Sequence, residues 1–279
     1  MSSFALGLVL SAAVLHATWN AMVKSGGDRA VVLAAVSLAT FLLGAALAIL
    51  SPLPAPAAWP FLALSAVLHC GYYAFLYYAY RFGDLSHVYP IARGIAPALV
   101  AAGAYLTIGE ELSWPALCGL AAISLGIMLL SVGRKATRGD PRALAFALGT
   151  GVIIASYSVT DGIGVRLAEA PFGYIGWLMA LELPVVIFVL ARRMRYGTPI
   201  DGRSFRIGLV GGILSVFAYG AVIYANSFTH LAAVSAVRES SVIFASLIGL
   251  VIFGERPWQR RLVSACIVAA GVIALASAG

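Results

Sequence analysis

Hydrophobic residues form long runs along the chain, separated by short polar breaks. A helix that crosses a membrane needs about 20 apolar residues, and ten runs reach or approach that length. They are residues 4–23, 30–50, 60–80, 88–108, 115–132, 143–167, 173–191, 205–228, 232–253 and 258–277. Apolar and polar positions do not alternate within the runs, as they would in strands of a membrane barrel. The pattern predicts an all-α integral membrane protein with ten transmembrane helices and no separate soluble domain.

The second half of the chain repeats features of the first. Arg93 lies 16 residues before Gly109, and Arg238 lies 16 residues before Gly254; both glycines precede a glutamate and end a run. The duplication predicts two five-helix repeats, residues 1–137 and 138–279. Because five is an odd number, the repeats must have opposite orientations. Inverted repeats around a central cavity are the plan of many secondary transporters.

Composition and charge agree with this class and add a predicted orientation. The chain is 62% hydrophobic and 10% charged, against about 45–50% and about 25% in soluble domains. The net charge of +7 does not indicate a nucleic-acid partner, because the basic residues lie in short loops beside the spans. Loops after odd-numbered spans hold fifteen Lys and Arg, and the opposite side holds only Arg166. This bias predicts a bacterial inner-membrane protein with both termini on the non-cytoplasmic side.

The three cysteines give no sign of a disulfide or a metal site. Cys70, Cys118 and Cys266 lie in separate runs and show no CxxC spacing. We therefore expect no metal and no cofactor. The fifth and tenth runs are rich in small residues, which predicts a packing surface or a dimer surface. A monomer and a dimer both remain open.

The third run raises the first question about a site, because it carries one histidine and five tyrosines. One helical face collects most of them: His69, Tyr72, Tyr73, Leu76, Tyr77 and Tyr80. Tyr77 lies near the cytoplasmic end, where an interfacial aromatic belt is the simpler interpretation. His69, Tyr72 and Tyr73 lie deeper, and a buried hydroxyl or imidazole needs a partner or water. For these three residues, the lining of a cavity competes with hydrogen bonds between packed helices.

Other runs offer matching polar positions. His16, Trp19 and Asn20 share one face of the first run, which suits either a hydrated lining or polar contacts between helices. Tyr157 takes the place of Trp19 in the sixth run, and Tyr224 adds a phenol in the eighth. We interpret all five as candidate substrate-binding residues.

Charged residues inside the runs are the stronger signal. A central Arg or Asp costs about 2.5–3.5 kcal/mol on insertion scales, so such residues are expected to be functional. Arg93 and Arg238 are predicted to meet a carboxylate, either of the substrate or of a gate; snorkelling to the headgroups is the alternative. Asp161, Glu182 and Glu239 are candidates for coupling or gating, since a desolvated carboxylate can carry a proton. A buried ion pair or a neutral, hydrogen-bonded acid is the alternative for each.

Pro90 and Pro97 flank Arg93 in the fourth run, whereas the ninth run has no matching prolines. Proline removes a backbone donor and clashes with the preceding turn. The sequence therefore predicts a kink or local break in the fourth span, and a hinge that differs between the two halves.

These residues together resemble a known group of proteins. The ten short spans, the segment "HATWNAMVK" (16–24) and the Gly-Glu pairs ending spans four and nine resemble the drug/metabolite transporter superfamily. The resemblance covers the whole chain and is strongest to EamA-type ten-helix transporters. It implies two inverted five-helix halves around a cavity. Trp19 is similar to the first-helix tryptophan of YddG-like aromatic amino-acid exporters, but "IARGIAPAL" lacks their fourth-helix aromatic cluster.

The predicted function is a secondary transporter that exports small amphipathic metabolites, with aromatic and hydrophobic amino acids as the first candidates. A broad-specificity metabolite or drug exporter of the same fold is the alternative. An intramembrane enzyme is a distant one, because the four histidines show no HExxH spacing and no Gly-x-Ser-x-Gly is present. The expected partners are a small-molecule substrate and the lipid bilayer.

Overall fold

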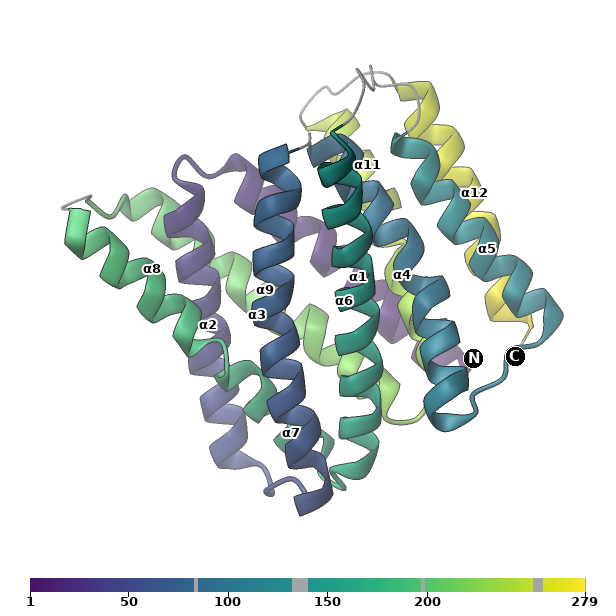
Figure 1. The fold of residues 1–279 in the computed structure, drawn as a ribbon, viewed down its shortest axis with the longest axis horizontal. Helices are drawn as coiled ribbons and strands as arrows, with labels where there is room; N and C mark the ends of the chain where they lie inside the picture. The colour runs from purple at the N-terminus through teal and green to yellow at the C-terminus, as the bar shows by residue number, and fades with distance from the viewer. Residues whose placement is uncertain (83–84, 132–139, 197–198, 253–257, 279) are drawn as a thin grey trace.

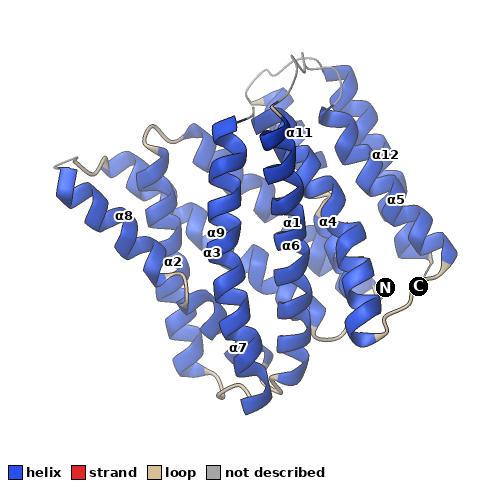
Figure 2. Ribbon diagram, in the orientation of Figure 1, coloured by secondary structure: helices blue, strands red, loops and turns tan. Residues whose placement is uncertain are grey.

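The fold consists of helices throughout the part of the chain that the structure, a computed structural model, describes: residues 1–82, 85–131, 140–196, 199–252 and 258–278 (Figures 1 and 2). No strand is present in these residues, so the all-α prediction is confirmed. The α-helices are α1 (Ser3–Ser25), α2 (Arg29–Leu50), α3 (Trp59–Phe82), α4 (Leu85–Ile108), α5 (Trp114–Met128), α6 (Pro141–Leu167), α7 (Pro171–Ala180), α8 (Leu183–Tyr196), α9 (Gly202–Asn226), α10 (Leu231–Arg238), α11 (Ser241–Val251) and α12 (Trp258–Ser277). Two short 3-10 helices, η1 (Pro56–Ala58) and η2 (Leu129–Ser131), complete the set.

Local sequence sets several helix ends. The carboxylates of Asp28 and Asp201 accept backbone N–H groups in the first turns of α2 and α9, which is the role of an N-cap. Gly109 ends α4 in the left-handed region, with φ 66°. The N–H of Gly109 bonds to the carbonyl of Tyr105, and the N–H of Glu110 bonds to the carbonyl of Ala104; the first of these is the closing bond of an αL C-cap. The first Gly-Glu pair noticed in the sequence is therefore a helix stop.

The predicted ten continuous spans need two corrections, because the seventh and the ninth are each interrupted. Within the described ranges, eight helical stretches are long and apolar enough to cross a membrane, and α5 is a shorter apolar helix. The predicted seventh span is instead two helices, α7 and α8, separated at Leu181 and Glu182. Pro184 explains the interruption, because its ring clashes with the carbonyl four residues earlier and it has no N–H to donate.

Of the kink or local break predicted in the fourth span, the break is absent. The helix α4 runs from Leu85 to Ile108 through both Pro90 and Pro97. The interruption lies in the ninth span, at Glu239 and Ser240, between α10 and α11. There the backbone closes by bonds between residues three apart, from Glu239 N to Ala236 O and from Val242 N to Glu239 O. Packing of α4 against α5 and α6 holds that helix together around its prolines, whereas Glu239 is buried among charged partners at a helix end.

Helix packing follows the order of the two halves. The helix α3 packs on α6 as α9 packs on α1, α4 packs on α6 as α10 and α11 pack on α1, and α5 packs on α12. The helix α1 begins at the end of the bundle where both termini lie, whereas α6 begins at the opposite end (Figure 1). The two series of helices thus run in opposite directions.

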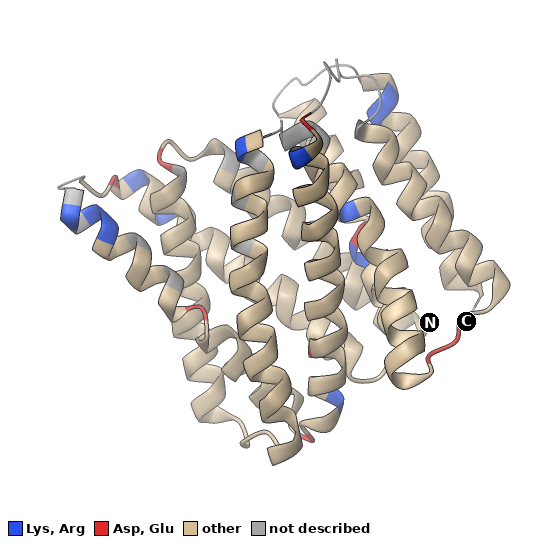
Figure 3. Ribbon diagram, in the orientation of Figure 1, with Lys and Arg blue, Asp and Glu red and all other residues tan. Residues whose placement is uncertain are grey.

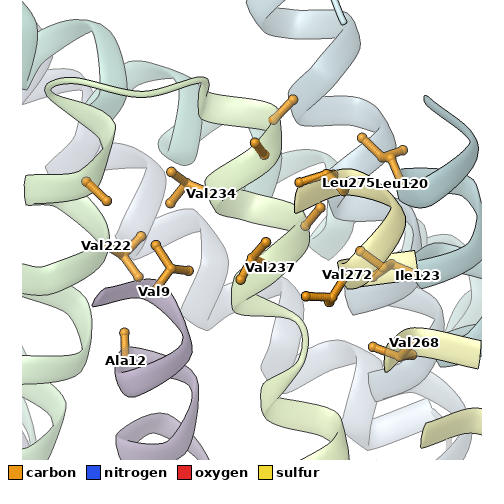
Figure 4. Packing of buried hydrophobic residues seen from close by; sticks show 14 of the residues in the cluster. Val9, Ala12, Leu120, Ile123, Val222, Val234, Val237, Val268, Val272 and Leu275 are labelled. Carbon is orange, nitrogen blue, oxygen red and sulfur yellow. The ribbon is translucent and has the colours of Figure 1, made fainter. Parts of the chain in front are cut away.

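The largest apolar cluster among the described residues joins six helices beside this packing (Figure 4). Its members include the buried side chains of Val9 in α1, Ile123 in α5, Val222 in α9, Val237 in α10, Val242 in α11 and Val272 in α12. Helix α10 is consequently anchored on several sides, which fixes the direction in which its polar residues point.

A close crossing of α5 and α12 gives a stability prediction. A Cβ added at Gly119 would lie 2.7 Å from the carbonyl oxygen of Gly271 and 2.8 Å from the backbone nitrogen of Leu275. We expect Gly119→Ala to lower the free energy of unfolding by about 1–3 kcal/mol, because backbone atoms cannot move aside. Gly7→Ala is the control: a Cβ there meets nothing within 4 Å, so its stability should stay level or rise. Unfolding in mixed detergent micelles measures both, and equal effects would contradict the crossing.

Basic residues gather at the end of the bundle opposite the two termini (Figure 3). Arg81 and Arg193 lie in last turns of α3 and α8 there, whereas Arg166 ends α6 at the other side. The prediction that the basic end faces the cytoplasm stays a prediction.

Candidate functional site

Two arginines and one glutamate form a buried charged group inside the bundle. Nε of Arg93, from α4, lies 3.0 Å from Oε2 of Glu239. The NH2 nitrogen of Arg238, at the end of α10, lies 3.6 Å from Oε1 of the same carboxylate. The side chains of Arg93, Arg238 and Glu239 are 8%, 7% and 0% exposed. Two guanidinium groups therefore share one carboxylate, and the three side chains together keep one excess positive charge.

Arg238 also lines a pocket between α6, α9 and α10. The pocket is tight, with a cavity volume of about 10 Å³, so a ligand larger than water can enter only when the surrounding helices move apart. Its polar lining residues are Ser158, Tyr219, Asn226, Ser235 and Arg238, and Val222 and Leu231 contribute to the apolar part. Asn226 Oδ1, Ser235 Oγ and two nitrogens of Arg238 have no hydrogen-bond partner among the described residues. Buried polar groups need partners, so the pocket is suited to a ligand that offers both an acceptor and a donor.

A second buried network surrounds Asp161 of α6. Its carboxylate accepts hydrogen bonds from Tyr174 of α7, at 3.1 Å, and from Tyr219 of α9, at 2.7 Å. His69 of α3 is bonded at Nδ1 to the carbonyl of Ser65, at 2.9 Å, and lies within electrostatic reach of Asp161. Tyr219 belongs to both places, because it lines the pocket and donates to Asp161.

Aromatic rings connect the two polar groups. The His69 ring stacks on Tyr157, with centroids 4.4 Å apart, and Tyr72 meets Tyr157 edge-on at 6.1 Å. His16 accepts a hydrogen bond from the Trp19 indole at 3.3 Å. Arg93 and Arg238 interact electrostatically with both His16 and Tyr72. Helices α1, α3, α4, α6 and α10 thus bring predicted residues to one region.

Other predicted residues lie outside that region. Tyr224 stacks on Phe172 at 5.2 Å and does not line the pocket. Glu182 lies at the break between α7 and α8 and accepts a hydrogen bond from Ser37 of α2, at 3.0 Å. Asn20 donates to the backbone carbonyl of His16 within its own helix. The side chains of Tyr73 and Tyr77 fall outside the part of the chain that the structure describes.

Sequence reasoning missed several residues of the pocket and its neighbours. They are Ser65, Tyr89, Ser158, Tyr174, Tyr219 and Ser235. Tyr89 places its ring 5.9 Å from the Arg93 guanidinium carbon, within cation–π range. The available signal for Tyr219 was a tyrosine inside an apolar run, five residues before Tyr224, which is among the predicted candidates. Serine gives no such signal, because small polar residues are common in packed membrane helices. Among the described residues, no group of three or more His, Cys, Asp or Glu could hold a metal ion.

A salt bridge at the basic end lies away from the pocket and is sensitive to acid. Arg193 of α8 donates to both carboxylate oxygens of Asp28, at 2.6 and 2.5 Å. This hydrogen bonding is the main cause that holds the pKa of Asp28 below its ordinary value of 3.8. A lowered folded-state pKa stabilises the fold above pH 3.8, and the contribution is lost as the pH falls through the folded value.

Asp28→Asn should therefore be less stable than the unaltered protein at neutral pH, with a difference that shrinks below about pH 3.8. Asparagine still caps a helix, so the comparison isolates the ion pair. Unfolding temperatures in detergent, measured from pH 3 to pH 7, test this. A difference that is constant over the whole pH range would contradict it.

The helical bundle, with its long apolar helices, is that of a multi-pass membrane protein. The EamA-like transporter family model matches residues 3–132 and again residues 141–277. The chain therefore belongs to the EamA-like transporter family, within the drug/metabolite transporters that its motifs resembled. This agrees with the prediction that it is not an enzyme.

The fold recurs among solved structures, although the sequences have diverged. Among 27 matching chains, one crystal structure superposes with a TM-score of 0.76 at 16% identity, over 98% of this chain and 96% of the other. At that identity the likeness concerns the fold alone. The chain matches none of the curated proteins.

Proposed function

We propose that the protein is a secondary transporter that exports small amphipathic metabolites carrying a carboxylate, with aromatic and hydrophobic amino acids as its first substrates. Residues 1–137 and 138–279 act as two inverted halves that alternate access to the pocket, whose lining residues belong to the second half and whose charged group receives Arg93 from the first. The protein lies in a bacterial inner membrane with both termini on the non-cytoplasmic side. The side chains of Arg238, Ser235 and Asn226 line the pocket with free donors and acceptors.

The observation that carries the proposal is the excess guanidinium of the charged group. Arg93 and Arg238 share one carboxylate, so Arg238 can accept a second one from a ligand in the pocket. Guanidinium binds carboxylate through two parallel hydrogen bonds. The acceptors Asn226 Oδ1 and Ser235 Oγ suit an ammonium group, and Val222 with Leu231 suits an apolar side chain.

Asp161 is the proposed coupling residue. It is fully buried and has His69 within electrostatic reach, and Tyr219 connects it to the pocket. A proton taken up by this carboxylate would weaken its pull on the Tyr219 hydroxyl, which lines the pocket. Glu182 is kept as a gating candidate at the α7–α8 break.

Counterflow in proteoliposomes tests the function. Vesicles loaded with unlabelled phenylalanine should accumulate labelled phenylalanine, and protein-free vesicles should not. Competition by phenethylamine as strong as competition by phenylalanine would favour a broad-specificity drug exporter. No exchange of amino acids or amines would contradict the proposal.

A further inference from the structure

We infer that Glu239 is an internal substitute for the substrate's carboxylate: it neutralises Arg238 while the carrier is empty and releases it when substrate binds. The inference rests on the proposed function, because it takes Arg238 to be the arginine that binds the substrate carboxylate and names Glu239 as its partner when no substrate is bound. It adds a prediction that the function alone does not make, namely how the empty carrier returns.

The two arginines hold Glu239 unequally. Arg93 Nε lies 3.0 Å from Oε2, whereas Arg238 NH2 lies 3.6 Å from Oε1. Neither ion pair has hydrogen-bond geometry, so Arg93 is the nearer counter-ion by distance, and of the two arginines Arg238 is the one that lines the pocket. Two Arg238 nitrogens are buried without a hydrogen-bond partner among the described residues, and the side chain lines the pocket. A substrate carboxylate in the pocket can therefore pair with Arg238, while Glu239 stays paired with Arg93.

The exchange keeps the buried charge balanced in both states. When the pocket is empty, Glu239 is the counter-ion of both guanidinium groups. When it is filled, each guanidinium has its own carboxylate. Without Glu239, the empty carrier would have to bury two guanidinium groups with no counter-ion, which is the most costly arrangement of such groups. Glu239 thus permits the empty carrier to change conformation, and so permits net transport as well as exchange.

The position of Glu239 links this exchange to the backbone. It lies at the interruption between α10 and α11, where its N–H bonds to Ala236 O and its carbonyl accepts from Val242 N. Both helices pack on α1, which carries His16. A shift of the carboxylate toward Arg93 therefore acts at the joint between two helices and not within a continuous one.

Glu239→Gln tests the inference, since the amide keeps the shape and removes the charge. Two rates are measured in the same proteoliposomes: exchange of labelled against unlabelled phenylalanine, and net efflux into phenylalanine-free buffer. We expect net efflux to fall at least about tenfold relative to exchange. The half-saturating phenylalanine concentration should also fall about threefold or more, because the glutamate no longer competes with substrate for Arg238; threefold corresponds to about 0.7 kcal/mol. Equal losses of both rates, or no change in their ratio, would overturn the inference.

Glu111→Gln is the matched control, because Glu111 is exposed in the connection after α4 and does not line the pocket; its ratio of exchange to net efflux should equal that of the unaltered protein. If Glu239→Gln is not recovered folded, Glu239→Asp carries the test. The shorter side chain of aspartate places the carboxylate farther from Arg238. The ratio of exchange to net efflux should still rise about threefold. An unchanged ratio would contradict the inference. Absence of exchange in the unaltered protein would instead refute the proposed function itself.

Discussion

Replacing Arg238 with glutamine is expected to raise the half-saturating phenylalanine concentration by about 30-fold while the protein still folds. Hydrogen bonds to charged groups contribute about 1.5–3 kcal/mol each, and 1.4 kcal/mol corresponds to about a tenfold change. Glutamine keeps a donor but loses the charge and the two-pronged geometry. Folding survives because Glu239 retains Arg93 at 3.0 Å.

Counterflow at graded phenylalanine concentrations measures this effect. Arg206→Gln serves as the control, since Arg206 is exposed in the first turns of α9 and does not line the pocket. Both variants lose one positive charge, so only the position differs. Equal half-saturation in the two variants would remove Arg238 from the binding site.

Replacing Arg93 with glutamine is expected to cause the larger loss of stability, about 3–5 kcal/mol. Removing one partner of a buried ion pair leaves the other charge uncompensated. Glu239 is 0% exposed, and its remaining partner, Arg238, is 3.6 Å away. The pair also joins the two halves of the chain, so its loss weakens their contact.

Equilibrium unfolding in mixed detergent micelles measures this loss. Arg193→Gln is the matched control, because that arginine also pairs with an acid, but at the end of the bundle, with side chains 14% and 33% exposed. Exposed pairs contribute about 1 kcal/mol or less. If Arg93→Gln proves as stable as Arg193→Gln, the buried pair does not hold the halves together.

The hydrophobic runs were sufficient to predict the class of fold, because a membrane imposes a minimum length on each apolar helix. They could not locate the two interruptions. Pro184 was a readable signal for the break between α7 and α8, whereas Pro90 and Pro97 suggested a break that α4 does not have. A proline's effect depends on whether neighbouring helices compensate for the lost hydrogen bond, and the sequence contains no such information.

Site residues could be predicted where their type is rare in membrane helices, as for arginine and histidine. They could not be predicted where the type is common there, as for serine. Arg93, Arg238 and His16 were found because charge and imidazole are costly in lipid. The pairing of Arg238 with Glu239 was not expected, because adjacent helical positions point about 100° apart. The helix ends at Arg238, and the turn that follows brings the two side chains to the same side. Ser235 and Asn226 depend on the rotation of α9 and α10, which only packing determines.

Comparing two ligands that differ in one group tests the central claim most directly. Phenylalanine and phenethylamine share the ring and the amine, and only the first has a carboxylate. We predict that the unaltered protein in detergent binds phenylalanine at least about tenfold more tightly, and that Arg238→Gln binds both about equally. Equal binding of the two ligands by the unaltered protein would contradict the account.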